Sequence, residues 1–180
     1  WVDALREALD LLATFVPGVR SEMDVLLQQI VPVGYDEARH VSASYRESIG
    51  TIYLSLHPHA LTLAEAVLHE FSHNKINALF ELDAVLHNAF SPLYPSPVRP
   101  DPRPLHGVLL AAHAFVPVAT LYGRLRAADH PLSRDPGFAR RFDEIVAANE
   151  EALQTLRAAR PTSCRAMPAS RRAFPCQGAV

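Results

Sequence analysis

Apolar residues recur every three or four positions along five stretches of the chain, which is the spacing of a helix that buries one face. Residues 2–15, 21–30 and 135–160 combine this spacing with charged residues on the opposite side, so they predict amphipathic helices. Residues 62–90 and 105–126 are more uniformly apolar and predict two helices that are largely buried. A proline and a glycine at positions 17 and 18 are expected to end the first helix.

The pattern changes between the second and third of these helices. Residues 40–45 and 51–56 are rich in β-branched and aromatic side chains, and residues 46–50 between them are suited to a hairpin turn. The chain is therefore predicted to be a mainly α domain with one short antiparallel β-hairpin. The hairpin edge offers a place for an extended peptide, with Ser44 and Tyr45 as the predicted substrate-binding residues. The alternative is that the hairpin only covers the neighbouring helix.

The remaining segments complete a single predicted domain at residues 1–160. Six prolines within residues 91–104 exclude a helix or a central strand there, so we expect an ordered surface loop. Residues 161–180 are expected to form an irregular tail. Cys164 and Cys176 lie in this tail and are predicted to be free thiols, with a disulfide between them as the alternative.

The composition is that of an ordinary globular protein, with 180 residues, of which 49% are hydrophobic and 20% charged. A net charge of −2 provides no clustered positive surface for nucleic acid or for an anionic membrane. We see no apolar run that approaches the roughly 20 residues of a membrane span, and no charged and then apolar leader. We therefore predict a cytoplasmic protein that binds neither nucleic acid nor membrane.

Residues 69–73 read His-Glu-Phe-Ser-His, which is an H-E-x-x-H motif. In an α-helix each residue turns by about 100°, so His69 and His73 project from one face and can share a metal ion. Thr62 followed by Glu65 has the form of a capping box, which favours a helix here. Unpaired polar groups are costly inside such an apolar helix, so the motif favours metal binding over two unrelated surface histidines.

A metal site needs at least one further ligand, and several residues are candidates. The metzincin pattern fails because Leu79 stands where its third histidine belongs, and Glu81 is too close in sequence to fold back as a gluzincin ligand. Asp101 remains a candidate for the further metal ligand. His106 and His113 lie on one face of the second apolar helix, roughly 10 Å apart along its axis, so one ion can take only one of them. We predict His113, with His106 as the second choice.

Three runs of sequence resemble one known family. GTIYLSL at 50–56, LAEAVLHEFSHNKINAL at 63–79 and DPRPLHGVLLAAHAF at 101–115 look like the HExxH proteins that are encoded beside ribosomal peptide precursors. The resemblance covers roughly residues 50–121. Members of the family are similar to non-haem iron enzymes that use 2-oxoglutarate and O₂ to hydroxylate the β-carbon of residues in a precursor peptide. Members often carry a histidine where this chain has Leu110, so the third ligand stays open.

The resemblance implies Fe(II), 2-oxoglutarate and a precursor peptide as the cofactor, cosubstrate and partner. Such an oxygenase needs three protein ligands on one side of the iron, which His69, His73 and a helix histidine can provide. It also needs a cation for the distal carboxylate of 2-oxoglutarate, and a bidentate arginine suits this best. Arg103 is our first choice and Arg46 the second.

Glu70 separates the oxygenase from its main alternative, a zinc metallopeptidase. In a peptidase Glu70 would be the catalytic general base that deprotonates the metal-bound water. In the oxygenase it would orient a ligand or hold a substrate amide. A third hypothesis is a domain that binds peptide or metal without catalysis.

Overall fold

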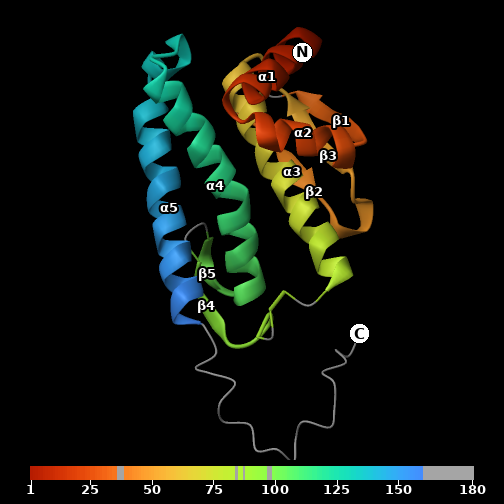
Figure 1. Cartoon of the computed structure of the whole chain (residues 1–180), viewed down its shortest axis with the longest axis vertical. Helices are drawn as coiled ribbons and strands as arrows, with labels where there is room; N and C mark the ends of the chain where they lie inside the picture. Colours follow the sequence, from red (N-terminus) through yellow and green to blue (C-terminus); the bar gives the residue numbers. More distant parts are fainter. Residues whose placement is uncertain (36–38, 84, 87, 97–98, 160–180) are drawn as a thin grey trace, which may run out of the picture.

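The computed structural model describes residues 1–35, 39–83, 85–86, 88–96 and 99–159. Within this part of the chain there are five α-helices, two short 3-10 helices and two small sheets (Figure 1). The mainly α prediction is therefore confirmed. The predicted irregular tail and its two cysteines lie outside the described residues.

The first two helices, α1 (Val2–Phe15) and α2 (Pro17–Leu26), are separated by one residue. The first helix ends at Phe15 as predicted. The second helix begins at Pro17 and not at the predicted residue 21, because the first turn of a helix does not need the N–H that proline lacks. The expected continuation of the second helix to residue 30 is also wrong. Strand β1 (Gln29–Tyr35) begins there instead, because Ile30 and Val31 pair with a strand that lies later in the chain.

The first sheet has the strand order β1-β3-β2. Strand β2 (Ser42–Ser44) pairs antiparallel with β3 (Thr51–Leu56) through the turn η1 (Arg46–Ser48), which confirms the predicted hairpin. The parallel pairing of β1 with the other side of β3 was not predicted. Strand β3 buries Ile52 and Leu54 and packs against the HExxH helix, while β2 remains an edge strand.

The proline-rich segment is more regular than predicted. Strands β4 (Leu93–Ser96) and β5 (Arg99–Pro104) form a two-stranded antiparallel ribbon, so the expectation of a loop is partly wrong. Both strands of such a ribbon are edge strands, and edge strands tolerate prolines. The ribbon packs against the helix that follows it and holds Arg103 at the start of that helix.

Three long helices build the rest of the domain, with the 3-10 helix η2 (Pro131–Arg134) between the last two. They are α3 (Ala60–Leu82), α4 (Leu105–Ala127) and α5 (Phe138–Ala158), and α4 lies between the other two (Figure 1). Helix α3 begins two residues before Thr62 and its N-cap makes no side-chain hydrogen bond, so the predicted capping box is wrong. Its stability comes instead from burial of side chains such as Leu68 and Phe71.

Helix α4 is long and apolar enough to cross a membrane when only its length and composition are considered. The statement that no run approaches that length was therefore wrong. In the structure α4 packs against α3 and α5 and buries Val108, Val118 and Leu121 completely. The core helix of a soluble protein passes the same test of length and composition.

Candidate metal centre

His69 and His73 lie one turn apart on α3 and direct their rings to the same place. Their Nε2 atoms are 3.0 Å apart, and the ring planes meet at 85°. Two imidazole nitrogens that each bind one ion at about 2.1 Å can lie this close together. The pair therefore fits the role of two ligands for a single metal ion.

Burial controls the protonation of this pair. Burial and, to a smaller extent, the repulsion of a positive charge by the nearby His69 and His113 together lower the pKa of His73 to about 4. Burial also lowers the pKa of His69. Both rings are therefore neutral at pH 7, which is the form that binds metals.

We expect the metal-free protein to lose stability as the pH falls from about 6.5 to about 4. In this range the unfolded chain protonates His73 and the folded protein does not, because the pKa in the folded state lies below the ordinary value of 6.5. For this residue the free energy of unfolding should fall by about 3 kcal/mol. Urea unfolding at a series of pH values measures the loss. His73→Gln should remove that part of the slope and His59→Gln, at an exposed site, should keep it; an unchanged slope in His73→Gln would contradict the assignment.

Glu70 connects α3 to the edge strand β2. Its side chain is buried, and its two carboxylate oxygens accept hydrogen bonds from the hydroxyls of Ser42 and Ser44, each at 2.7 Å. A general base needs an oxygen directed at the water that it deprotonates. Here both oxygens bind strand hydroxyls, so the geometry favours Glu70 as the residue that fixes β2 beside His69. Ser44, predicted to bind substrate, uses its hydroxyl in this contact.

A cavity of about 380 Å³ opens beside the histidine pair. Arg103 shares this cavity with His69 and His73, as do Ser96 and four residues of α4, namely Gly107, Leu110, Ala111 and Phe115. The Nε of Arg103 is 3.0 Å from Oδ2 of Asp101, which is an ion-pair distance, but the two atoms are not in hydrogen-bond geometry. The Nε of Arg103 is buried and forms no hydrogen bond within the described part of the chain.

The two predicted α4 ligands do not line this cavity. The ring of His113 forms a backbone hydrogen bond with Ser72, and its Nδ1 is buried without a partner. Burial lowers the pKa of His113, and the charge of Lys75 lowers it further. His113 lies near enough to His73 to affect its pKa, yet it stands outside the cavity that the histidine pair lines.

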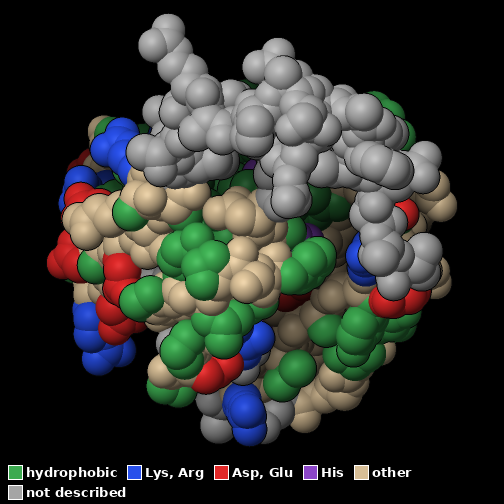
Figure 2. Space-filling model, turned by 90° about the horizontal axis from the view of Figure 1, so that it is seen from below, with side chains coloured by type: hydrophobic (Ala, Val, Ile, Leu, Met, Phe, Trp, Pro, Cys, Tyr) green, Lys and Arg blue, Asp and Glu red, His purple; other side chains and the backbone are tan. Residues whose placement is uncertain are grey.

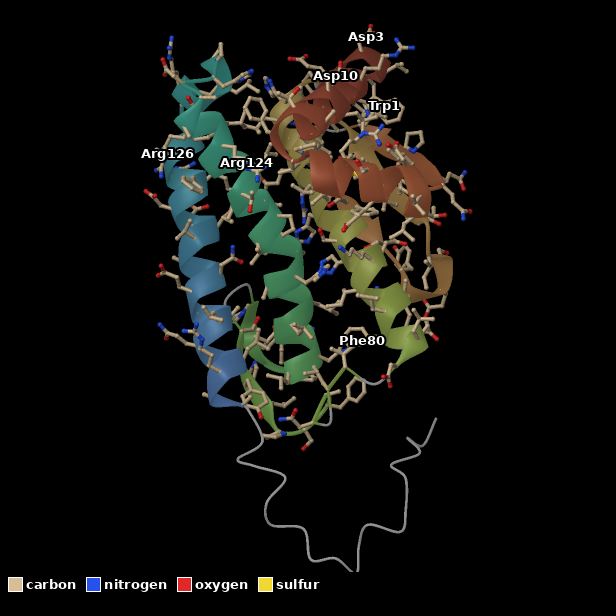
Figure 3. All side chains as sticks on the ribbon, in the orientation of Figure 1. Trp1, Asp3, Asp10, Phe80, Arg124 and Arg126 are labelled. Atoms are coloured by element: carbon tan, nitrogen blue, oxygen red, sulfur yellow. The ribbon has the colours of Figure 1, made fainter. Side chains whose placement is uncertain are left out.

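His106 and Arg46 lie together near the C-terminal end of α3. The His106 ring packs against Phe80, labelled in Figure 3, and against Phe90, with ring centroids 4.5 and 5.4 Å away. The Nε of Arg46 donates to Oε1 of Glu81 at 2.5 Å. These residues border a separate cavity of about 170 Å³ that the histidine pair does not line. The structure therefore does not bring His106 or Arg46 to His69 and His73.

This end of the molecule also carries exposed hydrophobic side chains, which appear in green in the view from below (Figure 2). The largest exposed fractions are 82% for Leu82, 69% for Phe90 and 60% for Leu93. Tyr45, the other predicted substrate-binding residue, is 53% exposed and packs edge-on against Tyr53, with ring centroids 5.4 Å apart. Tyr45 directly follows β2 with an extended backbone, so its side chain points to the opposite side from that of Ser44.

A second cavity, of about 440 Å³, lies on the other side of His69 and was not predicted. His69 and Phe115 line both cavities. Arg141 of α5 reaches this second cavity and forms an ion pair with Glu65, which also accepts a hydrogen bond from Tyr122 at 2.8 Å. No local pattern in the sequence predicts Arg141 as a residue of the site, because only tertiary packing brings α5 to α3. The charges of Glu65 and Arg141 largely balance each other.

Among the described residues, no group of three or more histidine, cysteine, aspartate or glutamate side chains lies close enough to hold a metal ion. No protein-family model and no curated protein matches the chain.

Proposed function

We propose that this protein is a non-haem Fe(II) and 2-oxoglutarate-dependent hydroxylase of a ribosomally made precursor peptide. The observation that carries the proposal is the cavity that His69, His73 and Arg103 share. It combines two ligands for a metal with a cation for a carboxylate. An oxo-acid with a second carboxylate uses both features, whereas hydrolysis by a metal-activated water does not require the second charge.

The proposed reaction converts a C–H bond of the peptide to C–OH and converts 2-oxoglutarate and O₂ to succinate and CO₂. One oxygen atom of O₂ enters the peptide and the other enters succinate. The C–H bond and the oxo-acid each lose two electrons, and O₂ accepts the four. Bound Fe(II) would supply the activation of O₂.

The side chains around the cavity have distinct roles in this proposal. Arg103 binds the distal carboxylate of 2-oxoglutarate through its N–H donors, and the ion pair with Asp101 helps to hold the guanidinium in place. Ala111 and Phe115 form an apolar wall that keeps water away from the histidine pair.

The peptide is expected to approach along β2. This strand is an edge of its sheet, and Glu70 fixes it to α3 one residue after His69. Ser42 of β2 also lines the second cavity together with His69. An extended peptide that adds to this edge would therefore pass beside the metal ligands, on the side away from Arg103.

Anaerobic reconstitution tests the proposal. Adding 2-oxoglutarate to the Fe(II) protein should produce the weak visible absorption band of oxo-acid chelation, and admitting air should then produce succinate. A precursor peptide should gain the mass of one oxygen atom. Tight zinc binding with peptide cleavage, and no band with 2-oxoglutarate, would instead support the zinc metallopeptidase.

A further inference from the structure

The residues of α4 that face the histidine pair carry no metal-binding atom. Gly107, Leu110 and Ala111 line the cavity, and their spacing of three and four residues places them on one face of α4. Leu110 is the longest of these side chains and is half-buried in the cavity wall. A donor from α4 would have to come from this face in order to meet His69 and His73.

The histidines of α4 are occupied elsewhere. His113 forms its backbone hydrogen bond with Ser72, and His106 packs between two phenylalanine rings at the end of α3. The described acidic residue nearest in sequence to this wall, Asp101, forms an ion pair with Arg103. The described part of the chain therefore offers two metal ligands in the cavity and no third.

We infer that Leu110 occupies the place from which α4 would supply a third protein ligand, so that the centre has two protein ligands and depends on a dicarboxylate oxo-acid for further donors. The identity of that oxo-acid rests on the proposed function, whereas the role of Leu110 does not. Catalytic metal centres commonly have three protein ligands, so a centre with two should bind its metal weakly. An oxo-acid anchored on Arg103 adds donors of its own, and each partner then increases the affinity for the other by the same factor.

The test is a titration of the full chain with Co(II), a probe that is stable in air, with and without 2-oxoglutarate. For the unmodified protein we expect 2-oxoglutarate to increase the affinity for Co(II) at least tenfold. Leu110→His should bind Co(II) at least tenfold more tightly than the unmodified protein in the absence of 2-oxoglutarate. His113→Ala should bind Co(II) as the unmodified protein does.

A second pair of variants keeps the test decisive if histidine is too large for the cavity wall. Leu110→Cys places a thiol there, and a thiolate bound to Co(II) gives an intense near-ultraviolet charge-transfer band. Leu110→Ala opens similar space without a donor and should give no such band. A merely structural effect of the substitution would not produce the band in one variant alone.

Several outcomes would overturn the inference. One is a loss of Co(II) affinity in His113→Ala, which would make His113 the third ligand. Another is that Leu110→His shows no gain in Co(II) affinity and Leu110→Cys shows no charge-transfer band. A higher Co(II) affinity in Leu110→His, combined with no effect of 2-oxoglutarate on the Co(II) affinity of the unmodified protein, has a different meaning. It would support the two-ligand centre and reject 2-oxoglutarate, and with it the proposed function.

Discussion

Replacing His69 with alanine is expected to weaken Fe(II) binding by at least about 100-fold and to abolish the formation of succinate. Loss of a residue that only supports a metal ligand typically costs 10- to 100-fold in affinity or activity, so the loss of a ligand should cost at least as much. The effect should be large because His73 is the one other described histidine that lines the cavity and could bind the metal. Anaerobic titration with Fe(II) in the presence of 2-oxoglutarate measures the change.

The matched control is His106→Ala. This histidine has a lowered pKa because of burial, as His69 does, but it packs between Phe80 and Phe90 rather than beside the pair. We expect the control to retain the Fe(II) affinity and the succinate yield of the unmodified protein. If His69→Ala also retained them, or if His106→Ala lost them, the metal would have to bind elsewhere.

The sequence was sufficient for the parts of the site that depend on local geometry. Four residues separate His69 from His73, and on a helix this spacing alone places the two rings together. Helix α4 was predicted almost to the residue, because its apolar run is long and begins directly after a proline-rich segment. The position of Arg103 just before α4 could also be read from the sequence, whereas the ribbon that holds it there was not predicted.

The sequence was not sufficient to predict which residues of α4 face the histidine pair, because this depends on how α4 is rotated relative to α3. His106 and His113 lie on one face of α4, and this suggested a ligand. In the structure the face that borders the histidine pair is the one with Gly107, Leu110 and Ala111. A helical pattern shows which residues share a face and does not show which neighbour that face meets.

Nonlocal contacts account for the remaining differences. Strand β1 forms because Gln29–Tyr35 can pair in parallel with β3, and the sequence signal for that pairing is interrupted by Pro32 and Gly34. Arg141 lies 76 residues from its partner Glu65, so its place beside His69 becomes visible only when α5 packs into the domain. Arg46 was predicted in the turn of the hairpin, and that turn carries it to Glu81 at the end of α3.

The second large effect is expected for Arg103→Gln, which should raise the concentration of 2-oxoglutarate needed for half-maximal succinate formation by about 30- to 700-fold. A charge-assisted pair that loses one partner typically costs about 2–4 kcal/mol, which corresponds to this range. Arg103 is not a metal ligand, so the affinity for Co(II) measured without 2-oxoglutarate should stay within about twofold of the unmodified protein. This split separates loss of cosubstrate binding from loss of the metal centre.

Three further substitutions show whether the effect belongs to Arg103 itself. Arg103→Lys keeps the charge but loses the planar pair of N–H donors, so it should restore part of the affinity for 2-oxoglutarate. Arg46→Gln should have no effect, because Arg46 borders a different cavity and is bound to Glu81. Arg141→Gln distinguishes the two cavities beside His69. If this substitution raised the requirement for 2-oxoglutarate while Arg103→Gln did not, the cosubstrate would bind on the β2 side, and the peptide could not use that side as proposed.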